Sequence, residues 1–125
     1  EFRRVLFRSR FGAEVNGIFA PNESTTIGMM LALDQVGLGR GKVKLIGYAN
    51  SQIFVDALRR GDLQGLVLQD PVRMGYLGVK AAVDYLQGRK VAKVVDTGVT
   101  LVTPQNMDTP ESKELLYPPL EKYLK

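Results

Sequence analysis

Short apolar runs alternate along this chain with stretches in which apolar residues recur at helical spacing. The apolar runs predict strands at residues 15–20, 43–48, 63–68 and 94–102. The intervals predict helices that end at Gly37, Gly61 and Gly88. The resulting order β-α-β-α-β-α-β predicts an α/β fold with an open parallel sheet, right-handed crossovers and helices on both faces. Residues 104–125, which contain four prolines at positions 104, 110, 118 and 119, predict a loop with one or two short helices.

Three of the predicted strands lead into uncharged hydrogen-bonding side chains. Asn22 follows the first strand, Asn50 and Ser51 follow the second, and Gln69 follows the third. In a parallel α/β sheet, ligands bind at the carboxyl ends of the strands. Amide and hydroxyl groups donate as well as accept hydrogen bonds, which suits a neutral polyhydroxyl ligand better than an anion or a metal ion. The pattern therefore predicts binding rather than catalysis.

Composition narrows the possible functions. Four arginines and one glutamate among the first ten residues supply +3 of the net charge of +4, so the rest of the chain is nearly neutral. Because nucleic-acid binding needs positive charge gathered on the folded body, we expect no nucleic-acid partner. Cysteine and histidine are absent, which disfavours an enzyme with a thiol nucleophile, a Ser-His-Asp triad or an imidazole-bound zinc. We expect no cofactor and no metal.

Residues 1–12 differ abruptly in composition from the remainder of the chain. This arginine-rich segment joins the first predicted strand without a cap or turn signal. We expect it to be a non-native or disordered arm, with a native basic amphipathic arm as the alternative.

Several segments together resemble one family. They are Ala20-Pro-Asn22-Glu-Ser-Thr-Thr26, Ile46-Gly-Tyr48, Gly61-Asp-Leu-Gln-Gly65-Leu-Val-Leu-Gln69-Asp-Pro71, Met74-Gly-Tyr-Leu-Gly78-Val-Lys80 and Asp96-Thr-Gly98-Val-Thr-Leu-Val-Thr-Pro104. In this combination the chain resembles type I periplasmic sugar-binding proteins, specifically the ribose-binding branch that serves ABC transporters. Such proteins clamp a ligand between two α/β lobes joined by three crossing segments.

The resemblance implies a division of this chain between the two lobes. Residues 13–69 would form the α/β core of the second lobe. Residues 70–95 would belong to the first lobe, most of which is absent from this sequence. Residues 96–125 would return as a strand and end as a tail on the second lobe.

The resemblance also implies roles for individual residues. Asn22 matches an asparagine that bonds sugar hydroxyls, although a helix N-cap alone would also explain it. Gln69 matches a hinge glutamine that reaches the sugar, and the alternative is a loop amide that satisfies backbone groups. The family's Gly-Phe-Asp is here Gly47-Tyr48-Ala49, so the carboxylate is missing and Asn50 or Ser51 is expected to substitute.

The function implied by the resemblance is that of a solute-binding component of an ABC sugar importer. We expect a small neutral sugar as ligand, a membrane permease as partner, and a monomeric protein when complete. The expected location is the periplasm, or the cell exterior as a lipoprotein. The alternative is the sugar-sensing domain of a LacI-type transcription regulator, which a helix-turn-helix upstream of this sequence would reveal.

Overall fold

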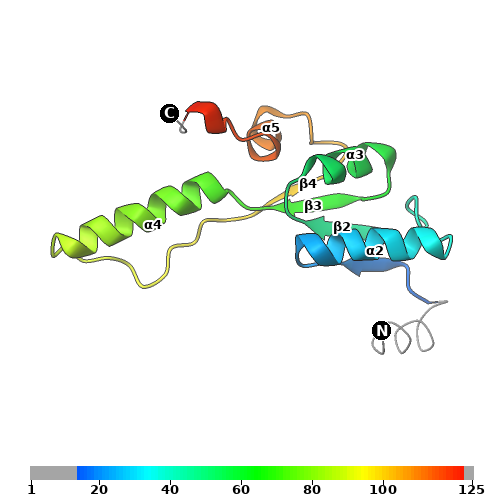
Figure 1. Ribbon diagram of the computed structural model, residues 1–125, viewed down its shortest axis with the longest axis horizontal. Helices are drawn as coiled ribbons and strands as arrows, with labels where there is room; N and C mark the ends of the chain where they lie inside the picture. Colours follow the sequence, from blue (N-terminus) through cyan, green and yellow to red (C-terminus); the bar gives the residue numbers. More distant parts are fainter. Residues whose placement is uncertain (1–13, 123–125) are drawn as a thin grey trace.

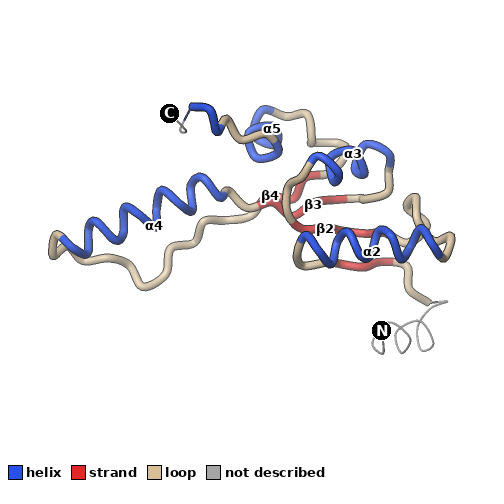
Figure 2. The backbone as a smooth tube through the Cα atoms, viewed as in Figure 1, coloured by secondary structure: helices blue, strands red, loops and turns tan. Residues whose placement is uncertain are grey.

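The computed structural model describes residues 14–122, so the prediction for residues 1–12 lies outside it. Strands and helices alternate along the chain (Figures 1 and 2). The strands are β1 (Gly17–Phe19), β2 (Lys44–Tyr48), β3 (Gly65–Leu68) and β4 (Thr100–Val102). The helices are α2 (Glu23–Gln35), α3 (Gln52–Arg60), α4 (Pro71–Leu86), α5 (Pro110–Leu116) and the 3-10 turn η1 (Leu120–Lys122).

The four strands form one sheet in the order β1-β2-β3-β4. The first three run parallel, with Ile18 beside Leu45 and Ile46 beside Gly65. This arrangement confirms the predicted open α/β sheet. The fourth strand departs from the prediction, because β4 pairs antiparallel with β3 and places Val102 beside Leu66.

The fourth strand is also shorter than predicted. Only Thr100–Val102 pairs, whereas residues 94–99 form no strand, and Val94 and Val95 are exposed. These residues run back from the tip of α4 as a loop (Figure 2), in which the Gly98 N–H bonds to Asp96 Oδ1 at 2.8 Å. An extended segment becomes a strand only where a neighbour accepts its backbone hydrogen bonds.

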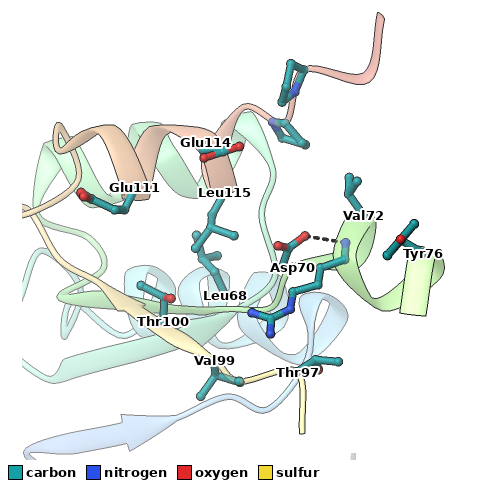
Figure 3. Close-up of a pocket in the computed structure, with 14 residues that line it drawn as sticks. Leu68, Asp70, Val72, Tyr76, Thr97, Val99, Thr100, Glu111, Glu114 and Leu115 are labelled. Atoms are coloured by element: carbon teal, nitrogen blue, oxygen red, sulfur yellow. Dashed lines mark hydrogen bonds between the residues drawn. The ribbon is translucent and has the colours of Figure 1, made fainter. Parts of the chain in front are cut away.

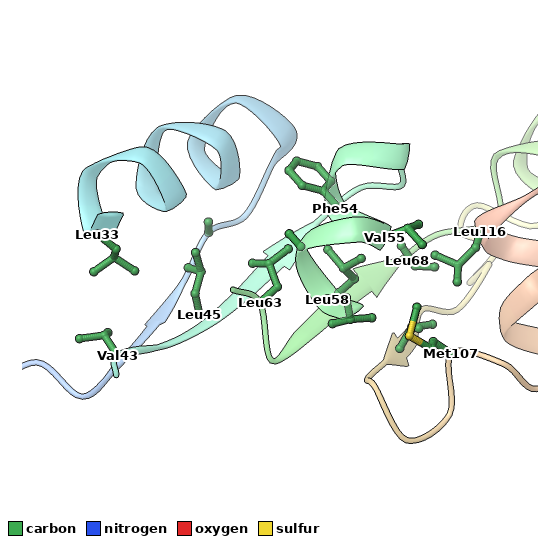
Figure 4. Packing of buried hydrophobic residues seen from close by; sticks show 14 residues of the cluster. Leu33, Val43, Leu45, Phe54, Val55, Leu58, Leu63, Leu68, Met107 and Leu116 are labelled. Carbon is green, nitrogen blue, oxygen red and sulfur yellow. The ribbon is translucent and has the colours of Figure 1, made fainter. Parts of the chain in front are cut away.

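The core lies between one face of the sheet and the helices α2 and α3 (Figure 4). Consecutive right-handed crossovers in the strand order β1-β2-β3 place both helices on the same face. On the opposite face Phe19 and Leu101 are more than half exposed. The buried apolar residues include Leu45, Phe54, Val55, Leu58, Leu63, Leu66, Leu68 and Val102.

Local sequence signals set the ends of α2. The Asn22 side chain accepts a hydrogen bond from the backbone N–H of Thr25, as an N-cap does. At the other end Gly37 has φ 71°, and the N–H groups of Gly37 and Leu38 bond back to Asp34 and Leu33. This pair of bonds is the Schellman arrangement that a glycine after a helix predicts.

Helix α4 projects away from the sheet (Figure 1). None of its residues is buried, and Tyr76 and Tyr85 are among its exposed side chains. The spacing of apolar residues predicted this helix correctly. The surface against which its apolar side chains would pack does not lie within the described residues. The large apolar side chains exposed on this helix are Met74, Tyr76, Val79, Val83, Tyr85 and Leu86.

A methyl group added at Gly47 should destabilise the fold. A Cβ there would lie 2.6 Å from Thr26 Cγ2 and 3.2 Å from Leu66 Cδ2, inside the packed layer between α2 and β2. We expect Gly47→Ala to lower the free energy of unfolding by about 1–3 kcal/mol in urea titrations. Thr26→Ser removes the nearer methyl group, so Gly47→Ala should cost less in that background.

The matched control for this substitution is Gly28→Ala on the exposed surface of α2. A Cβ at Gly28 would meet nothing within 4 Å, and alanine is the better helix former. This change should raise the free energy of unfolding by about 0.5–1 kcal/mol. Equal costs at both glycines would contradict the close approach at Gly47.

Candidate ligand-binding site

The predicted site residues lie at one edge of the sheet, because their strands are parallel neighbours. The N–H of Ala20 bonds to Ile46 O at 2.9 Å, and the N–H of Ala49 bonds to Val67 O at 3.3 Å. The carboxyl ends of β1, β2 and β3 are thereby held side by side. Ala49 and Gln69 directly follow β2 and β3, and Asn22 lies three residues after the end of β1. The structure places them along a common edge.

The side-chain oxygen of Asn22 accepts hydrogen bonds from protein donors, whereas its amide nitrogen is available to a ligand. Its Oδ1 accepts from the Thr25 N–H at 2.9 Å, from Ser24 Oγ at 2.9 Å and from Thr25 Oγ1 at 3.0 Å. Within residues 14–122 no hydrogen bond is found for its Nδ2. The N-cap role is therefore confirmed, and the exposed amide retains two N–H donors for a ligand oxygen.

Ala49 has a backbone conformation that alanine rarely adopts. Its φ is 93°, and the residue is half-buried where β2 turns toward α3. A left-handed conformation costs a residue with a Cβ about 1–2 kcal/mol, and Asp and Asn tolerate it better because their side chains bond locally. The strain lies at the position where the family resemblance expects an aspartate.

Asn50 and Ser51, the expected substitutes for that aspartate, have different surroundings. The Nδ2 of Asn50 donates to Leu115 O in α5 at 2.7 Å, so this amide holds the C-terminal helix instead of pointing freely into solvent. Ser51 occupies the N-cap position of α3, but its side chain makes no capping hydrogen bond. Its Oγ is buried without a partner in the described residues. Helix α3 therefore begins at Ser51 without a side-chain cap.

Gln69 lies exposed between β3 and the start of α4. Its neighbour Asp70 accepts from the Arg73 N–H at 2.8 Å and has Pro71 in the first turn, as the sequence predicts for an N-cap. Asp70 caps α4, so its side chain is engaged by the helix. Gln69 directly precedes Asp70, and its side chain takes no part in α4. Its amide can both donate and accept.

A cleft of about 950 Å³ lies beside this edge, between the start of α4, residues 97–100 and the C-terminal segment 111–119 (Figure 3). Leu68, Val99 and Leu115 form apolar parts of its lining, and Glu111 and Glu114 add carboxylates. Asn22, Ala49 and Gln69 do not line it. Sequence reasoning missed this cleft because it depends on the position of α5, a helix that begins more than 40 residues after β3.

Residues 14–122 contain no cluster of three or more acidic side chains able to hold a metal ion. Among the same residues, no helix is long and apolar enough to cross a membrane. The arrangement presents the amides of Asn22 and Gln69 at the carboxyl ends of parallel strands, which is the place where α/β proteins bind ligands.

The comparisons with known proteins place this class within a family. Residues 6–90 match the family described as periplasmic binding protein domain, and the chain belongs to it. This finding confirms the resemblance seen in the sequence.

Individual relatives agree with the family match. The chain is 32% identical over 99 residues to the fructose import binding protein FruE of Bifidobacterium longum, covering 79% of this chain and 28% of that protein. An ABC transporter solute binding protein from Agrobacterium vitis with bound D-fucose is 38% identical, with a TM-score of 0.78 over 93% of this chain and 39% of that one. A carbohydrate transporter solute binding protein from Agrobacterium radiobacter, in complex with D-arabinose, is 36% identical with the same TM-score over 92% and 38%. This chain thus spans well under half the length of these relatives.

Proposed function

We propose that this chain is part of the solute-binding component of an ABC sugar importer, and that it contributes one side of a site for a neutral monosaccharide. The observation that carries the proposal is the common edge formed by Asn22, Ala49 and Gln69 in a member of the periplasmic binding protein family. Uncharged amides match the hydroxyl groups of a sugar. The D-fucose and D-arabinose named for two structural relatives have the same chemistry. The partner in this role is a membrane permease, and the location is outside the cytoplasmic membrane.

The projection of α4 supports the further proposal that residues 70–95 belong to another lobe. An isolated helix gains little stability in water unless an apolar face is packed. Helix α4 has 16 residues, none of them buried, and its apolar side chains are left uncovered by residues 14–122. We infer that residues 13–69 and 96–125 form one lobe and that α4 packs in the other. The ligand would then bind between the two.

The test is a chimera in which residues 14–122 replace the matching part of the Agrobacterium vitis protein. Isothermal titration with pentoses and hexoses should detect a sugar that binds, and Gln69→Ala should weaken that binding by about 3–10-fold through loss of its hydrogen bonds. Gln87→Ala, at the far end of α4, is the matched amide control and should leave affinity unchanged. A folded chimera that binds none of the sugars would contradict the proposal.

A further inference from the structure

Thr26 is a fully buried polar residue at the junction of α2 and β2. Its exposed fraction is 0%, and only one other buried polar residue, Ser112, is found in the part of the chain whose burial is described. The Thr26 hydroxyl donates to Asn22 O at 2.7 Å and accepts from the Tyr48 N–H at 3.1 Å. One side chain thereby joins the first turn of α2 to the last residue of β2.

The second of these bonds is what distinguishes Thr26 from an ordinary helical threonine. A hydroxyl that bonds back to the carbonyl four residues earlier is common within helices and affects only its own helix. Here the same oxygen also receives an N–H from a strand 22 positions further along the chain. Gly47 leaves the space for this approach, since a Cβ there would lie 2.6 Å from Thr26 Cγ2.

The hydroxyl contacts one candidate site residue and the neighbour of another. The acceptor is the backbone of Asn22, and the donor is the residue directly before Ala49. We propose that Thr26 is a positioning residue that sets the spacing between Asn22 and Ala49 at the ligand-binding edge. This inference rests on the proposed sugar-binding function. A 1 Å displacement of groups that contact a ligand is enough to weaken binding substantially.

The experiment compares variants at Thr26 in the full 125-residue chain. Thr26→Val keeps the shape of the side chain but removes the hydroxyl, whereas Thr26→Ser keeps the hydroxyl and removes the methyl group. Thr26→Ala removes the hydroxyl with a better helix former and serves if the valine variant does not fold. Leu63→Ala is the control. Leu63 is fully buried just before β3, at the end of the strands opposite the candidate site.

Two readouts separate positioning from stability. Amide hydrogen exchange of Tyr48 should become about tenfold faster in Thr26→Val than in the native chain, once corrected for global stability, and Thr26→Ser should restore it. NMR titration with D-fucose and D-arabinose, up to about 100 mM, should show a dissociation constant raised about threefold to tenfold in Thr26→Val. Leu63→Ala should lower thermal stability and leave that constant unchanged.

Each outcome bears on a different claim. If the native chain responds to a sugar and Thr26→Val binds it equally well, the positioning role is overturned and the proposed function stands. If Leu63→Ala weakens binding as much as Thr26→Val, the effect is one of stability, and the positioning role is again overturned. If neither the native chain nor the chimera responds to a sugar, the sugar proposal falls. The positioning role is then judged by the amide exchange of Tyr48, and an exchange rate left unchanged by Thr26→Val overturns it.

Discussion

The isolated 125-residue chain should bind D-fucose, D-arabinose and similar sugars no more tightly than about 1 mM, whereas the chimera with a complete first lobe should reach about 1 µM. The edge formed by Asn22, Ala49 and Gln69 supplies few ligand contacts. The Oδ1 of Asn22 is occupied by three donors, and Asn50 is bonded to Leu115. Each net hydrogen bond contributes only about 0.5–1.5 kcal/mol. Half of a clamp should therefore give about half of the binding free energy.

Calorimetry of both proteins against the same panel of pentoses and hexoses measures this difference. A chimera carrying Gln69→Ala shows how much affinity is lost with one ligand contact, because both lobes remain. Low-micromolar binding by the isolated chain would contradict the two-lobe assignment, because the contacts at one sheet edge would then suffice. The thousandfold gap is the largest effect that we expect from any single comparison of this protein.

The second large effect concerns Ala49. In the chimera, Ala49→Asp should tighten binding of a ribose-type sugar about 10–100-fold, because a well-placed charged acceptor contributes about 1.5–3 kcal/mol. The backbone favours the change: φ at Ala49 is 93°, a conformation that Asp adopts more readily than Ala. Stability should therefore rise or remain unchanged, provided that the carboxylate reaches water or a ligand hydroxyl.

Two further variants separate backbone relief from charge. Ala49→Gly relieves the strained φ and adds no acceptor, so it should stabilise the fold without a gain in sugar affinity. Ala49→Asn adds an uncharged acceptor of the same shape and should give a smaller gain than Asp. If the Asp variant is stable and no pentose or hexose binds more tightly, the site is adapted to a different ligand. The sugar assignment would then fall, and membership of the binding-protein family would remain.

The differences between expectation and structure follow a physical distinction. Most signals that act within a few residues were interpreted correctly: Asn22 caps α2 and Gly37 ends it, although Ser51 begins α3 without a side-chain cap. Features that depend on distant segments were not. The sequence pattern carries no information on the direction of β4, on the exposure of Tyr76 and Tyr85, or on the use of Asn50 to hold α5.

The sequence by itself determined the class of this protein. The alternation of apolar runs and helical patterns predicted an α/β sheet, and it placed Asn22, Ala49 and Gln69 after the strand ends. Such patterns reflect local backbone preference and burial, which the sequence carries directly. Only the tertiary structure decided which of those groups are free to act. Hydrogen bonds between residues far apart, such as those of Thr26 with Tyr48 and of Asn50 with Leu115, form only after the register of the sheet has brought their partners together.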